Sequence, residues 1–400
     1  MHIQELKELA MSRIDDLIAE YCPNGVERKP LGAIAKLYRG NGLQKKDFTD
    51  KGIGCIHYGQ IYTRYDTFTS QTISFVDKKL ADKLLKVHPN DLIVTATSEN
   101  LEDVCKAVAW LGGSDIVTGG HSIVVRHHQN AKYLSYYFQT LDFFQRKRAY
   151  VHGTKVMEIK KDDLAKIVVP VPPLPVQEEI VRILDSFSSL EAELEAELEA
   201  RRKQYAYYRD QLIRDCPSVR WIPLSEISEN CDKSRKPIKK EKRIAGKTPY
   251  YGASGVVDHV DGFTHEGDYL LLSEDGANLL ARSMPIAYQI SGRNWINNHA
   301  HVLRIENANL RQLVEMYLNS ISLEPYITKG AQPKLTKQRM ETIVVPVPSE
   351  DDLSRIVEML TKFYALTTSL TDGLPAEIEA RRKQYEYYRD RLLSFDELAV

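Results

Sequence analysis

The sequence predicts an α+β protein in which two similar β-rich globular domains are separated by two long antiparallel helices that form a coiled coil. Three observations lead to this pseudo-twofold arrangement. The charged, tyrosine-bearing segment Glu199–Leu212 returns as Glu379–Leu392 with 12 of 14 positions identical. A glycine-punctuated, β-rich stretch precedes each copy. The phrase Ile-Val-Val-Pro-Val-Pro closes each β-rich stretch, so the chain repeats a whole domain followed by a helix.

A chain of 400 residues exceeds what one compact core normally holds and indicates more than one domain. The pattern divides the chain into an N-terminal helix that completes the second helical repeat, a first β-rich domain, a first spacer helix, a second β-rich domain and a second spacer helix. We expect these segments at residues 1–24, 25–172, 173–215, 216–348 and 349–400.

The composition is that of a globular protein, with 43% hydrophobic and 27% charged residues and a net charge of -1. We find no run of about 18 apolar residues and no apolar signal-peptide core, so we expect a cytoplasmic protein without membrane contact. Five cysteines without a Cys-x-x-Cys pair indicate neither a disulfide framework nor a zinc site.

The first segment has apolar residues at near-helical spacing up to Tyr21. Its ending, Leu17-Ile18 followed by Cys22-Pro23, resembles Leu212-Ile213 followed by Cys216-Pro217, where the first copy of the helical repeat stops. We therefore expect the N-terminal helix to be the tail of a repeat that begins near the C-terminus.

The two β-rich domains consist of short, β-branched runs between glycines. His121–Arg126 and His299–Arg304 match at an offset of 178 positions. The duplication therefore covers the domains as well as the helices, although most side chains differ. Alternate prolines at the end of each domain predict an edge strand that leaves the sheet.

The spacer helices carry apolar residues or tyrosines at alternating steps of three and four, which is typical of a coiled-coil seam. The second helix has four more residues between its halves than the first. Gly373 and Pro375 fall there, so we expect a kink or one irregular turn. Ser349 ahead of Asp352 resembles a capping box.

A spacer helix of about 38 residues is roughly 57 Å long and equals about 17 base pairs of DNA. Two similar heads held at such a spacing fit two major-groove half-sites. The second domain supplies the denser set of candidate DNA contacts: a basic loop for phosphates, then residues able to reach base edges. They are Lys233, Arg235, Lys236, Lys239, Lys240, Lys242 and Arg243 in the loop, followed by Tyr250, Tyr251, Ser254, Arg293, Asn294, Asn297 and Asn298.

The first domain has a thinner set of such residues: Arg39, Lys45, Lys46, Tyr58, Gln60, Tyr62 and Arg64. For the basic loop, a solvated surface role is about as well supported by composition. For each single base-reading candidate, a structural role is favoured over base contact.

Catalytic motifs are not apparent. Gly246-Lys247-Thr248 lacks the upstream glycine of a phosphate loop, because position 241 is Glu241. His299 and His301 lack partners at metal-ligand spacing, and His301 is predicted to be packed within a strand. We therefore predict no catalytic residues, no metal and no cofactor in this chain.

Four features of the sequence together resemble the specificity (S) subunit of Type I restriction-modification systems. They are the duplicated Val-Pro-Val-Pro helix entry, the paired Arg-Arg-Lys-Gln-Tyr-x-Tyr-Tyr-Arg-Asp-x-Leu helices, Asn297-Asn298-His299-Ala-His301 and Tyr250-Tyr251-Gly-Ala-Ser-Gly. The resemblance covers nearly the whole chain. It implies two target recognition domains, each reading one half of an asymmetric, split DNA sequence.

The same resemblance implies partners that carry the chemistry. The helices would bind two copies of the S-adenosylmethionine-dependent methyltransferase (M) subunit. Restriction (R) subunits, which use ATP and Mg, would join to cleave unmodified double-stranded DNA. The inserted turn near Gly373 departs from the regular repeat and leaves the domain spacing open.

Two sets of residues in the repeat have different expected roles. Tyr205, Tyr208, Tyr385 and Tyr388 continue the seam and are expected to pack helix on helix. Residues off that seam are candidates for docking the methyltransferase subunits, because tyrosine and arginine are enriched at interface hot spots. These are Arg201, Arg202, Tyr207, Arg381, Arg382 and Tyr387.

Two alternatives of other classes remain at this point. One is a self-contained DNA-modifying or cleaving enzyme, which the missing motifs disfavour. The other is a coiled-coil assembly protein that presents two β-rich heads.

Overall fold

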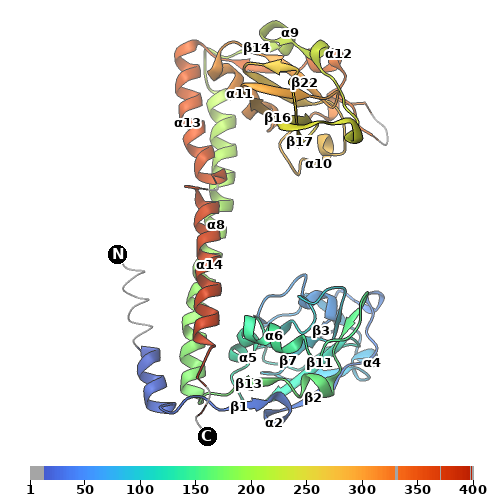
Figure 1. Cartoon of the computed structure of the whole chain (residues 1–400), viewed down its shortest axis with the longest axis vertical. Helices are drawn as coiled ribbons and strands as arrows, with labels where there is room; N and C mark the ends of the chain where they lie inside the picture. The colour runs from blue at the N-terminus through green and yellow to red at the C-terminus, as the bar shows by residue number, and fades with distance from the viewer. Residues whose placement is uncertain (1–12, 329–331, 370, 397, 399–400) are drawn as a thin grey trace. The chain divides into compact units, whose positions relative to one another are not determined.

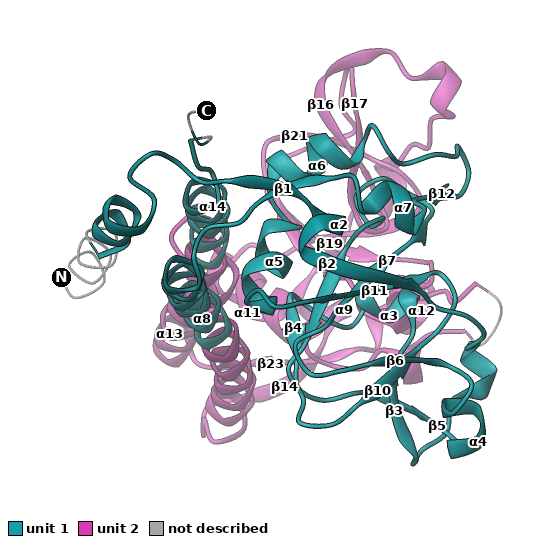
Figure 2. Cartoon of the chain, turned by 90° about the horizontal axis from the view of Figure 1, so that it is seen from below, with its two compact units in different colours: residues 1–194, 378–400 teal, residues 195–377 magenta. Residues whose placement is uncertain are grey.

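The computed structural model describes residues 13–328, 332–369, 371–396 and 398. The chain forms two compact units (Figure 2): Met1–Leu194 together with Ile378–Val400 is unit 1, and Glu195–Glu377 is unit 2. Each unit contains one β-rich domain and one pair of helical segments.

Unit 1 is built on two principal sheets. The larger has the order β2 (Ala35–Arg39), β11 (Ser122–His127), β7 (Leu92–Thr95), β9 (Ala107–Trp110) and β4 (Phe68–Thr69). The smaller has the order β5 (Ser74–Val76), β3 (Ile53–Ile56), β10 (Ile116–Thr118) and β6 (Leu85–Val87). Two small sheets complete the unit: β1 (Arg28–Pro30) with β13 (Val168–Pro170), and β12 (Met157–Glu158) with β8 (Thr97–Ser98).

Short helices lie between these strands. They are α2 (Leu31–Ile34), the 3₁₀ turn η1 (Lys45–Asp47), α3 (Tyr58–Ile61), α4 (Lys78–Ala81), α5 (Ala131–Tyr137), α6 (Leu141–Lys147) and α7 (Lys161–Leu164). Figure 1 shows α5 between the larger sheet and the long helix α8 (Leu174–Arg214). Tyr136 and Lys132 on α5 fix this contact, because each makes a hydrogen bond to a carboxylate oxygen of Asp185 at 2.7 Å.

Unit 2 repeats the two-sheet plan. One sheet has the order β15 (Glu229–Asn230), β22 (Ala300–Arg304), β19 (Tyr269–Ser273) and β20 (Ala287–Ile290). The other has the order β17 (Gly255–Val260), β16 (Ala245–Gly252), β21 (Arg293–Ile296) and β18 (His265–Glu266). β14 (Arg220–Pro223) pairs with β23 (Val344–Val347) in a separate ribbon.

Helices and 3₁₀ turns also connect the strands of unit 2. They are α9 (Leu224–Ile227), the 3₁₀ turns η2 (Asp232–Ser234) and η3 (Lys240–Lys242), α10 (Asn278–Ala281), α11 (Ala308–Leu318), η4 (Glu324–Tyr326), α12 (Lys337–Glu341) and α13 (Glu350–Thr368). Like α5 in unit 1, α11 packs on a spacer helix, burying Leu313 and Met316 against Leu353 and Leu360 of α13.

The registers show that most strands of the two domains are equivalent, although unit 1 has the additional strand β4 in its larger sheet. In the smaller sheet of unit 1, β10 pairs in parallel with β3, joining Thr118 to Ile56. In unit 2, β21 pairs in parallel with β16, joining Ile296 to Tyr251. Thr118 and Ile296 are 178 positions apart, the offset predicted from the sequence. The flanking strands β5 and β17 are antiparallel to β3 and β16 respectively.

The proline-rich phrases form β13 and β23, which pair only with β1 and β14 in two-stranded ribbons. A proline has no backbone N–H to donate to a sheet ladder, which disfavours these strands in the interior of the main sheets. The predicted edge strands are confirmed. Each ribbon ends where a spacer helix begins, at Leu174 or Glu350.

The spacer helices pack antiparallel inside each unit (Figure 1). In unit 1, Phe187 of α8 contacts Tyr388 of α14 (Leu374–Leu392), and Glu191 of α8 contacts Arg382 of α14. The two helices therefore run in opposite directions. In unit 2, Ile213 and Tyr205 of α8 contact Leu353 and Tyr364 of α13. The predicted fold class of two β-rich domains with antiparallel helices is therefore confirmed.

The second spacer is broken, whereas the first is one continuous helix. α13 ends at Thr368 and α14 begins at Leu374, as the four inserted residues predicted. The capping box expected at Ser349 is wrong, because Ser349 makes no side-chain cap hydrogen bond. Ser218 takes this role: its hydroxyl donates to Asp352 at 2.6 Å and accepts from the Ser349 amide at 3.1 Å.

Part of the predicted N-terminal helix lies outside the described residues, and residues 13–21 are helical. Ile14 is fully buried in the same cluster as Leu392 and Leu393. The amide of Val26 donates to the carbonyl of Asp396 at 2.9 Å, so the segment after the N-terminal helix contacts the segment after α14 in unit 1. Whether this helix completes the second repeat stays a prediction.

Candidate nucleic-acid interface

Residues from several elements of unit 1 gather where β3 and β10 end. The ring of Tyr58, which follows β3, lies 5.0 Å from the ring of His121, which follows β10. His57 and Tyr62 lie 4.4 and 6.4 Å from the Tyr58 ring, measured between ring centroids. The structure thus brings the predicted residues Tyr58 and Tyr62 together in one half-exposed aromatic cluster.

Gln60 has a structural role within this cluster. Its amide nitrogen donates to Ser74 at 2.7 Å, and its amide oxygen accepts from the His57 backbone at 2.9 Å. The side chain therefore closes a capping box on α3. Burial, and then the charges of Lys45 and His121, lower the pKa of His57. Lys45 therefore lies close to the aromatic cluster.

The basic residues predicted in unit 1 fall into two groups. Arg39 is held in the fold, because its guanidinium donates to Glu158 at 2.9 Å and to the Ile159 carbonyl at 3.3 Å. Lys45, Lys46 and Arg64 are exposed, and none of the three makes an ion pair with the described residues.

In unit 2, Arg235 belongs to a partly buried charge network. Its guanidinium contacts the carboxylates of Asp232 and Glu274 and donates to the Ala300 carbonyl at 2.8 Å. His301, 1% exposed, contacts Asp232 through Nδ1 at 2.7 Å and the Leu335 carbonyl through Nε2 at 2.8 Å. His301 lies in β22, so its prediction as a packed strand histidine is confirmed.

This network includes the described group of side chains best arranged to hold a metal ion. The ligand atoms of Asp232, Glu274 and His301 lie within 4.8 Å of one another. Both His301 nitrogens already face protein oxygens, and Arg235 and Lys334 contribute positive charge next to the carboxylates. The arrangement serves to tie the start of the basic loop to β19 and β22.

Some other residues of the basic loop are held by contacts within unit 2, and others are exposed. Arg243 pairs with Asp258 at 2.9 Å and lies 4.3 Å above the Tyr250 ring. The backbone amide of Lys236 donates to the Ile296 carbonyl at 3.0 Å, while its side chain is exposed. The remaining loop lysines, Lys233, Lys239, Lys240 and Lys242, are exposed and make no ion pair within the described part of the chain.

The predicted base-reading residues of unit 2 lie at two ends of β21. Asn297 and Asn298 follow the strand, next to Tyr251, whose carbonyl accepts from the Asn297 amide at 3.1 Å. Arg293 begins the strand and pairs with Glu266. Four residues of strand place these ends about 13 Å apart. The structure therefore brings Tyr251 and Asn297 together but leaves Arg293 elsewhere.

Several of these polar side chains stabilise the fold. Asn294 is 2% exposed and donates to the carbonyls of Ser291 and Gly292. Tyr250 is 1% exposed, and its hydroxyl accepts from the Ile238 amide at 3.0 Å. Tyr251 stacks on Tyr288 at 5.8 Å, and Ser254 lies half-buried before β17. DNA contact by any of the predicted residues stays a prediction.

The helical repeat forms nearly the same local structure in each unit. Tyr205 and Tyr385 each lie 5.8 Å beneath the guanidinium of the arginine four residues later. Tyr208 packs on Phe363 and Tyr388 on Phe187, so the predicted seam residues do pack helix on helix. Tyr207 and Tyr387 are each 61% exposed.

The arginines predicted to dock a partner differ from one another in their side-chain contacts. Arg201 and Arg381 each donate to the glutamine three residues later, Gln204 and Gln384. Arg382 pairs with Glu191 of α8 in unit 1. Arg202, its equivalent in unit 2, is exposed.

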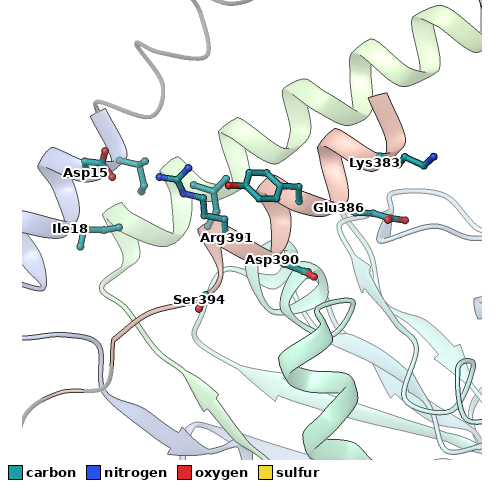
Figure 3. Close-up of a pocket in the computed structure, with 10 residues that line it drawn as sticks. Asp15, Ile18, Lys383, Glu386, Asp390, Arg391 and Ser394 are labelled. Carbon is teal, nitrogen blue, oxygen red and sulfur yellow. The ribbon is translucent and has the colours of Figure 1, made fainter. Parts of the chain in front are cut away.

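A groove of about 780 Å³ lies beside α14 in unit 1 (Figure 3). It is lined by the helix of residues 13–21 on one side and by α14 on the other. Its lining includes Tyr387 together with Lys383, Asp390 and Arg391, so the exposed tyrosine lies in a surface of mixed charge. Docking of a partner at this surface stays a prediction.

Among the described residues, no helix is both long enough and apolar enough to cross a membrane.

Comparison with known proteins identifies the family. The model of the Type I restriction modification DNA specificity domain matches residues 23–200 and again residues 220–380. The chain therefore belongs to the Type I restriction modification DNA specificity family, with two copies of its domain.

Curated relatives have the same assignment. The chain is 34% identical over 255 residues to the EcoR124I/EcoR124II specificity subunit of Escherichia coli, covering 58% of this chain and 63% of the relative. It is 37% identical over 184 residues to a Haemophilus influenzae sequence assigned to the same class, covering 45% of this chain and 47% of that one. The matches thus span about half to two thirds of these relatives.

Two solved structures share the fold over almost the whole chain. The S subunit of a Type-I restriction-modification system from M. genitalium is 17% identical, with a TM-score of 0.51 and coverage of 92% of this chain and 96% of that one. A chain from the type I R-M system, solved to explain complex assembly and conformational transition, is 15% identical, with a TM-score of 0.60 and coverage of 93% and 98%.

Proposed function

We propose that this chain is the sequence-specific DNA-recognition subunit of a Type I restriction-modification complex, and that each β-rich domain reads one half of an asymmetric bipartite site. The observation that carries the proposal is the pair of domains that share most of their strand order and differ in their side chains. Equivalent strand ends carry Tyr58 in unit 1 and the stretch from Tyr251 to Ser254 in unit 2. Different side chains on one scaffold select different sequences.

The helices are the proposed docking surface for two copies of the methyltransferase subunit. Identical partners need identical surfaces, and the repeat presents Tyr207 and Tyr387 with equal exposure. In this scheme the present chain is non-catalytic. S-adenosylmethionine binds to the methyltransferase subunits, and ATP and Mg bind to restriction subunits that join the complex in the cytoplasm.

The exposed lysines supply sequence-independent affinity. Lys45 and Lys46 in unit 1, and the lysines on and around η3 in unit 2, have no ion pairs with the described residues and can neutralise phosphates. Phosphate contacts position a protein on the duplex, whereas base contacts select the site. The lysines are exposed in both units, whereas the base-contact candidates Tyr58 and Tyr251 are half-buried.

The decisive experiment expresses the chain with its methyltransferase subunit and maps methylated adenines across the host genome. We expect one bipartite motif whose halves differ. Exchange of residues 216–348 for the equivalent domain of another specificity subunit should change one half only. Methyl transfer or DNA cleavage by the purified chain alone would instead establish a self-contained enzyme. Equal binding to all duplexes, or none at low salt, would favour an assembly protein.

A further inference from the structure

Histidines occupy one equivalent position in the two domains. β10 and β21 are equivalent strands, and three residues after their paired positions Thr118 and Ile296 come His121 and His299. The backbone contacts of the two residues agree as well. The His121 carbonyl accepts from the Ala96 amide at 2.8 Å, and the His299 carbonyl accepts from the Glu274 amide at 2.9 Å.

The two imidazoles are also held in the same way. Nδ1 of His121 lies 2.9 Å from the hydroxyl of Thr97. Nδ1 of His299 lies 2.9 Å from a carboxylate oxygen of Asp275. Thr97 and Asp275 are themselves equivalent, because each lies two residues beyond Thr95 or Ser273, which pair with Ser122 and Ala300.

Both rings are exposed and keep one nitrogen available. Within the described part of the chain, neither Nε2 makes a hydrogen bond, while each Nδ1 is occupied. A carboxylate only accepts, so Nδ1 of His299 carries a proton and the tautomer is set by Asp275. An exposed imidazole held through one nitrogen presents the other as a directional hydrogen-bonding atom.

The backbone at His121 supports a specific placement. Its φ is +66°, a left-handed conformation that costs a non-glycine residue free energy. The approach is also tight, because a Cβ on the nearby Gly119 would lie 2.4 Å from Cβ of Leu43. His299 does not have a positive φ, so the two histidines agree in their hydrogen bonds but not in backbone conformation.

Each histidine lies among residues already proposed to contact DNA. The Tyr58 ring is 5.0 Å from His121, and Lys45 is near enough to His57 to lower its pKa together with His121 and burial. The side-chain oxygen of Asn297 accepts from the His299 amide at 2.8 Å. His121 therefore lies beside an aromatic ring and near a lysine, and His299 lies beside an amide side chain.

We propose that His121 and His299 are equivalent base-edge contacts, one for each half-site, in which Nε2 makes a hydrogen bond to a base in the major groove. Thr97 and Asp275 are positioning residues that fix each ring. This inference rests on the proposed DNA-recognition function and adds the specificity-determining position. Each domain places a histidine at an equivalent position after an equivalent strand, while the neighbouring side chains differ.

The test measures competition binding of the chain, in complex with its methyltransferase subunits, to duplexes with every base changed in each half-site. His121→Ala should reduce discrimination at one position of one half-site about tenfold, the usual size for one base contact. His299→Ala should do the same in the other half only. Thr97→Val and Asp275→Asn, which keep the histidines, should give smaller losses at the same positions.

Controls separate the inference from folding and from the proposed function. His121→Asn tolerates the left-handed backbone and shows whether the fold survives loss of the ring. Exposed His128 and His259 lie outside these positions, and their alanine variants should leave discrimination unchanged.

Three results would overturn the inference. Discrimination could change less than twofold in both variants. Both half-sites could change together. Binding to all duplexes could weaken equally with a shallower salt dependence, which would identify phosphate contacts. A wild-type complex that binds all sequences equally would contradict the proposed function itself.

Discussion

The interiors of the two β-rich domains differ at the very positions where their strands are equivalent. In unit 2, His301 and Glu274 contribute to a network with Asp232 and Arg235. At the positions 178 residues earlier, unit 1 has Ile123 and Ala96, both fully buried in an apolar cluster. One backbone scaffold therefore accepts either an ionic or an apolar interior. Strand order, and not the identity of these side chains, is what the duplication has kept.

The largest expected effect comes from breaking this network. His301→Ala removes a buried ring and the hydrogen bond from its imidazole to Asp232, and should destabilise unit 2 by about 3 to 4 kcal/mol. Unit 1 should be unaffected. Denaturant-dependent hydrogen exchange, which reports each unit separately, measures both values.

A matched variant sharpens the same comparison. The double change His301→Ile and Glu274→Ala installs the side chains of unit 1 and leaves Asp232 paired with Arg235. We expect it to recover at least half of the loss, since apolar replacement of buried ionic groups is often neutral. A double variant less stable than His301→Ala would show that the domains are not interchangeable at these positions.

The second prediction concerns the stability of unit 1 at acidic pH. Burial lowers the pKa of His127 to about 4, and the equivalent position in unit 2 is Ile305. The unfolded chain binds a proton at this histidine below about pH 6.5, whereas folded unit 1 does so only near pH 4. The contribution of neutral His127 to the free energy of unfolding of unit 1 is therefore complete above pH 6.5. It is lost as the pH falls toward 4, by about 3 kcal/mol in total.

The variant His127→Ile should remove this part of the acid sensitivity of unit 1. His57, whose pKa burial also lowers, will still contribute a smaller loss of the same sign. The check is the free energy of unfolding of unit 1 measured at several pH values. Equal slopes for the variant and the wild type would rule out His127 as the source.

The third prediction contrasts the helical repeat with the domains. Tyr207→Ala and Tyr387→Ala should each weaken the docking of one methyltransferase copy by about 2 kcal/mol, typical of an interface hot spot. Because both rings are 61% exposed, stability should change little. Mass measurement of the complex should show one bound copy in place of two. Glu193→Ala, outside the repeat, is the control and should leave two copies bound.

The smallest effect is expected from the lysines. η1 in unit 1 and η3 in unit 2 are both short 3₁₀ turns with exposed lysines. Each Lys→Gln change at Lys45, Lys46, Lys240 or Lys242 should weaken binding to every duplex and reduce the salt slope by about 0.9. An unchanged slope at one turn would show that its lysines lie away from the DNA. Salt-dependent binding isotherms on a fixed duplex provide the measurement.

The sequence alone determined the architecture, because two copies offset by 178 to 180 residues can be aligned with each other. That alignment shows the order of domain and helix directly. Seam positions such as Tyr208 and Tyr388 followed from helical periodicity, and the break near Gly373 followed from the four inserted residues. The exposed Tyr207 and Tyr387 were identifiable for the same reason, since each lies off the seam. Periodicity reports which face of an element is buried, and these features depend on little else.

Only the tertiary structure decided which polar side chains are available. Arg39, Gln60, Arg235 and Asn294 carry the right groups for DNA contact, yet each is held by partners distant in sequence or by a local turn. His121 and His299 stood in the matching segments, but their tethers to Thr97 and Asp275 come from another strand. Composition gives the chemistry of a side chain, whereas long-range pairing of strands decides which of its atoms remain free to bind.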